Sequence, residues 1–288
     1  MPLVSTAWQL VSSILVFFAG LVIAIWLGRK FKLSGLRAAI IYFWHTLFCF
    51  VYLWFVLSYG GDALSYFLNS TKATPISVWA RPALISSPRF LSQTFDLSLL
   101  GTFLLHNVFG SIGLLAFAGS LRHASLGKTK YIRRLVAVII FLPSISFWSS
   151  ALGKDALAFM AAGLVLWAAI ELKNRKILMG IGIAAMFLVR PHIAGFMVLA
   201  LIGASVFDSR SPGWQRATVA IIALVVSAFL IPFALNYAGV GRTSMLKGFR
   251  SMLTKRQSVN AQGDTSVDIA SMSWPMKLFT YMFRPDTA

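Results

Sequence analysis

Arg190 and His192 are the most unusual residues of this chain, because they flank Pro191 at the centre of an apolar run. Residues 177–207 carry no other charged side chain. A charge inside such a run is costly unless it faces water or an ionic partner, so it predicts a functional site. A guanidinium binds phosphate oxygens, and an imidazole can carry a proton near neutral pH. The alternative is an arginine that only marks a helix end and extends to the membrane interface.

A second apolar run is interrupted in the same way. Residues 141–159, FLPSISFWSSALGKDALAF, contain Pro143 and four serines before Lys154 and Asp155. Asp155 could complement the positive end of the following helix, but the helix dipole disfavours a lysine there. We therefore predict that Lys154, with Asp155 beside it, belongs to a site for an anionic ligand. Trp148 is either an interfacial anchor or a stacking surface for a sugar.

A third candidate segment, YGGDALSYF at residues 59–67, places Asp62 after two glycines that permit a tight turn. Its carboxylate predicts either the N-cap of a short helix or an acid or base beside a substrate. Further along, WARPALISSPRF at residues 79–90 adds Arg81 and Arg89. Their guanidinium groups are suited to binding a diphosphate or an acidic sugar.

Apolar length predicts the elements that position these residues. The chain has 288 residues, of which 58% are hydrophobic and 12% are charged, which is typical of an integral membrane protein. We predict an all-α, polytopic membrane bundle of about 8 helical spans, including two short hairpins. The predicted spans cover residues 8–28, 38–58, 97–120, 135–150, 155–172, 177–190, 193–207 and 217–235.

The segment that holds Arg190 is predicted to be one of the short hairpins. Residues 177–207 are too many for one span and too few for two, at about 1.5 Å per residue across a core of about 30 Å. Pro191 is expected to end the first arm, because the residue before a proline avoids helical geometry. Arg190 and His192 would then lie at the tip of the hairpin.

The distribution of basic residues predicts the orientation. Lys and Arg accumulate on the cytoplasmic side of membrane proteins, so four basic segments are predicted to be cytoplasmic and the N-terminus exterior. The first span is then an uncleaved anchor, and the loop 59–96, both hairpin tips and the tail are exterior. The basic segments are residues 29–37, 122–134, 173–176 and 208–216.

The chain is predicted to divide into a transmembrane domain, residues 1–235, and an exterior tail, residues 236–288. Within the tail, Met245, Phe249 and Met252 follow helical spacing, while basic residues occupy other faces. This pattern predicts a basic amphipathic helix on the outer membrane surface, and a solvated basic linker is the alternative.

Several classes of function have no motif in the sequence. The formal net charge is +18, but the basic residues lie beside the spans and form no separate patch with aromatic residues, so nucleic acid is not a predicted partner. Cys49 is the single cysteine, and we predict neither a metal site nor a cofactor. Glycine-rich nucleotide loops and hydrolase motifs are not found. The acidic residues lie at span ends or in loops, which disfavours a proton-coupled transporter.

Four short motifs together resemble a group of multispanning bacterial membrane proteins, the polysaccharide and O-antigen polymerases, with features of glycosyltransferases that use lipid-linked sugars. The motifs are YGGDALSYF (59–67), LPSISFWSSALGKDAL (142–157), LVRPHI (188–193) and MFRP (282–285). The resemblance implies an enzyme of the bacterial inner membrane, surrounded by membrane lipids, that transfers glycans from undecaprenyl diphosphate at the outer face. It also implies further spans after the residues that match Arg284 and Pro285, so the chain is expected to stop before them.

The resemblance implies roles for the candidate residues. Asp62 would be the acid or base near the acceptor, with His192 as the alternative, and Arg190 with Lys154 would face the diphosphate leaving group. Substrate binding is assigned to Arg81, Arg89, Trp148, Asp155 and Arg284. Two other functions remain open: a non-catalytic membrane subunit of an envelope-glycan assembly, held by partner proteins, and a small-solute transporter with broken helices.

Overall fold

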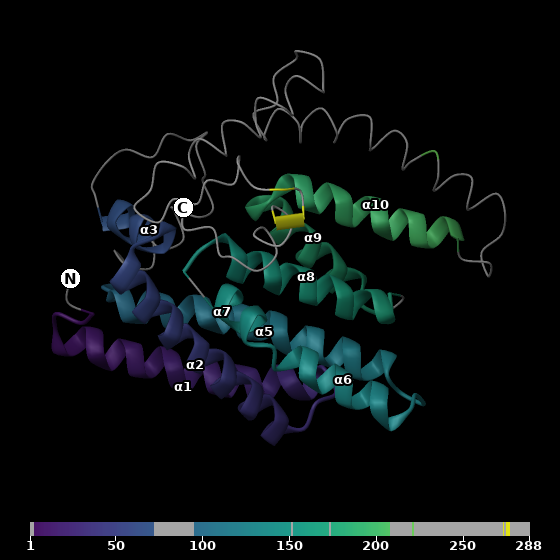
Figure 1. The fold of residues 1–288 in the computed structure, drawn as a ribbon, viewed down its shortest axis with the longest axis horizontal. Coiled ribbons are helices and arrows are strands. Elements are labelled where there is room, and N and C mark those ends of the chain that lie inside the picture. The colour runs from purple at the N-terminus through teal and green to yellow at the C-terminus, as the bar shows by residue number, and fades with distance from the viewer. Residues whose placement is uncertain are drawn as a thin grey trace, which may run out of the picture. The chain divides into compact units, whose positions relative to one another are not determined.

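The computed structural model describes residues 3–71, 95–150, 152–172 and 174–207, with the isolated positions 221, 273, 275 and 276. The chain divides into two compact units, Met1–Ala194 and Gly195–Ala288. Most of the described residues belong to the first unit, which is described here by itself. The regular elements of the described residues are helices, which confirms the all-α prediction (Figure 1).

Four helical segments in the described part of the chain are long and apolar enough to cross a membrane. They are α1 (Ala7–Lys30), α2 (Gly35–Tyr59), α5 (Leu99–Ala124) and the segment Lys130–Ser149, which contains α6 (Lys130–Ile140) and α7 (Pro143–Ser149). These segments support the prediction of a membrane protein in its general form.

The remaining described helices are shorter, and they are α3 (Asp62–Thr71), α8 (Lys154–Ile170), α9 (Lys176–Val189) and α10 (Pro191–Phe207). Helices of 14 residues, such as α9, or 17 residues, such as α8, fall short of a hydrocarbon core of about 30 Å. The count of about eight spans therefore remains a prediction. The predicted span 217–235 and the predicted tail lie outside the described residues, apart from the isolated positions.

Local signals set where the helices begin and end. Thr6, Ser34 and Ser98 precede α1, α2 and α5, and each side-chain oxygen accepts a hydrogen bond from the backbone N–H three residues later. At the end of α2, Gly60 has φ 78° and Gly61 has φ 143°, which a residue with a side chain rarely adopts. The two glycines therefore produce the sharp turn into α3.

Helix α5 is the most buried of the four candidate spans, and its glycines admit close neighbours. Of its most apolar stretch, 78% is buried, compared with 22% for α1. A β-carbon added at Gly113 would lie 2.7 Å from the backbone of Met160 in α8. One added at Gly163 of α8 would lie 2.4 Å from the carbonyl oxygen of Gly113. The backbones of α5 and α8 are thus in direct contact, as small residues permit in membrane bundles.

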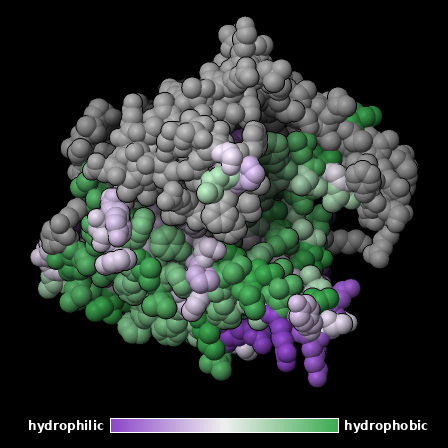
Figure 2. Space-filling view, viewed as in Figure 1, coloured by the Kyte–Doolittle hydropathy of each residue, from purple (hydrophilic) through white to green (hydrophobic). Residues whose placement is uncertain are grey.

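The outward faces of α1 and α2 are apolar and match a lipid environment. Trp8, Phe18 and Trp26 on α1, and Phe43 and Trp54 on α2, each expose about half of their surface or more. Figure 2 shows this apolar surface, with hydrophilic residues gathered at one end of it. A bilayer would cover the apolar surface and leave the hydrophilic end in water.

The two ends of the first unit differ in the turns that they hold. The turns between α1 and α2, between α5 and α6, and between α8 and α9 lie together at what we call the basic end. There the Arg122 side chain donates to the carbonyl oxygen of Lys32, and the rings of Phe31 and Trp167 meet edge to face at 5.6 Å. The opposite end, called the tip end, holds the start of α1, the α7–α8 turn and Arg190.

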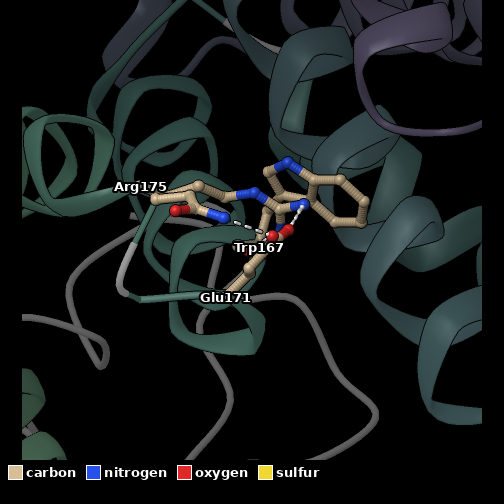
Figure 3. Close-up of polar contacts among 4 residues, drawn as sticks. Trp167, Glu171 and Arg175 are labelled. Atoms are coloured by element: carbon tan, nitrogen blue, oxygen red, sulfur yellow. Dashed lines mark hydrogen bonds and ion pairs between the residues drawn. The ribbon is translucent and has the colours of Figure 1, made fainter.

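At the basic end, Arg175 joins the α8–α9 turn to the end of α8 (Figure 3). Its guanidinium lies 4.1 Å from the ring centroid of Trp167, donates to the carbonyl oxygen of Trp167 at 2.8 Å and pairs with Glu171 at 2.7 Å. Hydrogen bonding from Asn174, and then the charge of Arg175, lower the pKa of Glu171. These contacts close the turn and give Arg175 a structural role.

The predicted orientation can be tested with two exposed positions at opposite ends. Tyr59 is 65% exposed at the end of α2, and Leu126 is 63% exposed beside the α5–α6 turn. In intact cells, Tyr59→Cys is expected to react with an impermeant thiol reagent and Leu126→Cys is expected to react only after lysis. Native Cys49 is 1% exposed and should contribute little background. The reverse pattern would place the tip end in the cytoplasm.

Candidate functional site

The predicted site residues differ in how much the structure describes. Lys154, Asp155, Arg190, His192 and Trp148 are described in full. For Asp62 only the backbone is described. It was predicted as the N-cap of a short helix, and in the structure it is the first residue of that helix, α3. Arg81, Arg89 and Arg284 lie outside the described residues.

Arg190 and Asp155 form an ion pair between the two predicted hairpins. The Arg190 guanidinium Nη2 donates to Asp155 Oδ1, and their side chains are 32% and 53% exposed. Sequence reasoning had placed Arg190 with Lys154 and had not foreseen this pairing. The pair joins the start of α8 to the end of α9, and it brings Lys154, Asp155 and Arg190 into one cluster, here called the tip cluster.

The chain breaks that create the tip cluster follow the predicted signals. Helix α8 begins at Lys154, directly after Gly153, and its first turn contains Asp155. Helix α9 ends at Val189, and α10 begins with Pro191, whose fixed φ suits a first helical position. Arg190 therefore occupies the single residue between two helices.

His192 belongs to the same neighbourhood, outside the four candidate spans. Burial lowers its pKa, and the nearby cations Arg190 and Lys154 lower it further. The lowered pKa favours the neutral imidazole at pH 7, which is the form that can accept a proton.

The contacts between α5 and α8 show that the tip cluster is recessed. Gly113 of α5 meets Met160 and Gly163 of α8, and Gly119 meets Trp167, so the two helices run parallel. If the same pairing of residues continues toward the tip end, Lys154 at the start of α8 lies beside His106 of α5. Lys154 therefore lies roughly 10 Å further into the bundle than Leu99, at about 1.5 Å per residue.

At the tip end, helix α1 extends further than the tip cluster. Ser13 lies against Gly101, and the Trp8 indole N–H donates to the carbonyl oxygen of Phe95 at 3.1 Å, so α1 reaches past the start of α5. Figure 1 shows α8 beginning short of the ends of α1 and α2. The charged side chains thus lie below the rim formed by these helices.

Aromatic residues stand beside the α7–α8 turn. The Trp148 ring is 39% exposed and meets Phe147 edge to face at 5.2 Å and Tyr52 of α2 at 6.1 Å. Phe147 itself packs on Tyr52 at 4.9 Å and on Phe55 at 5.8 Å. Trp148 is therefore supported from behind and presents part of its ring outward, which suits either of its two predicted roles.

Helix α3 packs against the same region. Ala63 and Phe67 of α3 belong to one buried hydrophobic cluster with Leu152 of the α7–α8 turn and Leu53 of α2. The segment that begins at Asp62 is thus anchored near the turn that precedes Lys154. The structure brings the three predicted segments of the site to one end of the bundle.

A buried polar chain behind the turn was missed by sequence reasoning. His45 of α2 is 0% exposed, with Nδ1 2.6 Å from Asn107 Oδ1 of α5 and Nε2 3.0 Å from Ser149 Oγ of α7. The Asn107 amide donates to Thr46 Oγ1 at 2.8 Å. The available signal was a histidine and an asparagine inside apolar spans, where polar side chains require partners.

Comparison with known proteins adds no relative to this description. No family model matches the chain, no curated protein matches it, and no solved structure matches it.

Proposed function

We propose that this protein is a glycan polymerase or glycosyltransferase of the bacterial inner membrane, acting on undecaprenyl-diphosphate-linked sugars at the outer face. The observation that carries the proposal is the recessed tip cluster, in which Lys154 and Arg190 lie together below the rim of a membrane bundle. A diphosphate attached to a membrane-embedded polyprenyl chain would reach this depth from the lipid.

The ion pair with Asp155 leaves Arg190 able to serve a phosphate. A guanidinium has five N–H donors in a planar fork, and the described pairing engages one of its terminal nitrogens. Asp155 then orients the fork, and Lys154 adds a second positive charge in the first turn of α8. Together the cations would stabilise the negative charge that develops on a departing diphosphate.

The acceptor hydroxyl requires a base, which we assign to Asp62 or His192. The lowered pKa of His192 keeps it neutral and able to accept a proton near neutral pH. Trp148 would stack on a sugar ring beside the cations. The proposed orientation places the N-terminus and all these residues outside the cytoplasm.

The direct test of the proposed function is a profile of lipid-linked oligosaccharides in cells with and without the gene. We expect undecaprenyl-diphosphate-linked repeat units to accumulate in the deletion strain and surface glycans to shorten. Unchanged lipid-linked and surface glycans, with loss of uptake of a solute, would support the transporter alternative instead.

Asp62→Asn separates a structural carboxylate from a chemical one. At the first residue of α3, asparagine removes only a favourable charge–dipole contribution of about 0.3–1 kcal/mol, so a structural role predicts normal surface glycans. A base or acid role predicts loss of glycan assembly at normal membrane abundance, because the amide cannot exchange the proton. We expect the loss; full complementation by Asp62→Asn would transfer the role of base to His192.

A further inference from the structure

We infer that His45 is a positioning residue, which holds the α7–α8 turn at its recessed depth through Ser149. His45 is fully buried in α2, and its two ring nitrogens reach α5 on one side and α7 on the other. Ser149 is the last residue of α7, and Lys154 follows five positions later. The polar chain therefore ends at the segment that carries the tip cluster.

The direction of each hydrogen bond follows from the partners of Asn107. Its amide nitrogen donates to Thr46 Oγ1, and the Thr46 hydroxyl donates to the carbonyl oxygen of Tyr42 at 2.8 Å. Asn107 Oδ1 is then the acceptor that faces His45, so His45 carries its proton on Nδ1. Nε2 is left with a lone pair that faces the Ser149 hydroxyl at 3.0 Å. The same hydroxyl donates to the carbonyl oxygen of Ile145 at 2.6 Å, so its single proton is shared between that carbonyl and His45 Nε2.

The backbone of Ser149 also packs closely against α5. A β-carbon at Gly110 of α5 would lie 2.0 Å from the carbonyl oxygen of Ser149 and 2.7 Å from the His45 ring. The turn thus contacts α5 at a place where only glycine fits. Loss of the hydrogen bond would leave a buried nitrogen without its partner, a cost larger than that of an exposed bond.

Ser149, His45 and Asn107 resemble the arrangement of three side chains that activates a serine nucleophile. Burial argues against that role here, because Ser149 is 4% exposed and its carbonyl is packed on α5. A nucleophile needs access for its substrate, and Ser149 is almost fully buried. A positioning role needs no such access, so the geometry favours it.

The inference can be tested in purified protein, independently of any activity. Gly153 lies next to Lys154, a β-carbon added there meets nothing within 4 Å, and its φ of 161° is extended backbone that any residue adopts. Gly153→Cys, in a Cys49→Ala background, is therefore a well-tolerated reporter. Its rate of labelling by a charged maleimide measures how exposed the turn is to water.

Ser149→Ala and His45→Gln are expected to raise this labelling rate by about fivefold to tenfold, the scale of one buried hydrogen bond. Ser150→Ala is the matched control, because Ser150 is equally buried and donates only to Phe147 within its own turn. The control should label at the parental rate. Equal rates in all four proteins would overturn the inference.

The inference rests on the proposed function only for its effect on glycans. A second experiment, which measures glycans, distinguishes failure of the inference from failure of the proposed function. Ser149→Ala is expected to reduce surface-glycan length in a deletion strain. Faster labelling with unchanged glycans would keep the positioning role and remove the proposed function. Loss of glycans with unchanged labelling would remove the positioning role.

Discussion

Arg190→Lys is expected to lose glycan assembly nearly as completely as Arg190→Ala. Lysine keeps the charge and can still reach Asp155, but its ammonium cannot make the planar, two-pronged contact with a phosphate. Hydrogen bonds to a charged group contribute roughly 2 kcal/mol, so we expect a loss of about 30-fold in transfer rate. The measurement is surface-glycan length on gels, with each variant checked for membrane abundance.

Arg175→Lys is the matched control, because Arg175 is also an ion-paired arginine at a helix end. Its partners Trp167 and Glu171 lie in and directly after α8, at the basic end and away from the tip cluster. The control is expected to give normal glycan length. Normal glycans from Arg190→Lys as well would reduce Arg190 to an arginine that only marks a helix end.

Gly163→Val is expected to destabilise the protein strongly. The new β-carbon would lie 2.4 Å from the carbonyl oxygen of Gly113, and neither backbone can move aside without separating α5 from α8. Overpacking of a core typically costs about 1–3 kcal/mol, and a backbone clash lies at the upper end of this range. We expect a clear fall in the melting temperature of the purified protein.

Gly180→Val provides the comparison for that measurement. Gly180 lies in α9, where an added β-carbon meets nothing within 4 Å. The two variants make the same change of residue type in a helix, so they differ in packing rather than in helix propensity. A melting temperature for Gly163→Val that matches Gly180→Val would contradict the close contact between α5 and α8.

Local features of this protein could be predicted because local physics determines them. Pro191 begins a helix, and Gly60 and Gly61 form a sharp turn, and both breaks stand where the sequence predicted them. The length and apolar character of α1, α2 and α5 likewise indicated membrane helices. A fixed φ, a missing side chain and a long apolar run act within a few residues, whatever the rest of the chain does.

Pairings between distant residues could not be predicted. His45 meets Asn107 and Ser149 across 62 and 104 residues, and Arg190 meets Asp155 across 35. Many pairs of polar residues could have satisfied one another equally well. The recessed depth of Lys154 depends on the contact of Gly113 with Gly163. The spacing of glycines in a sequence does not show which other helix each glycine contacts.

Binding of a polyprenyl diphosphate to the purified protein in lipid nanodiscs tests the central claim most directly. We expect saturable retention of radiolabelled undecaprenyl diphosphate by the wild-type protein, with retention reduced about 30-fold by Arg190→Lys and unchanged by Arg175→Lys. Equal retention by the wild-type and Arg190→Lys proteins, or no saturable retention at all, would contradict a diphosphate site at the tip cluster.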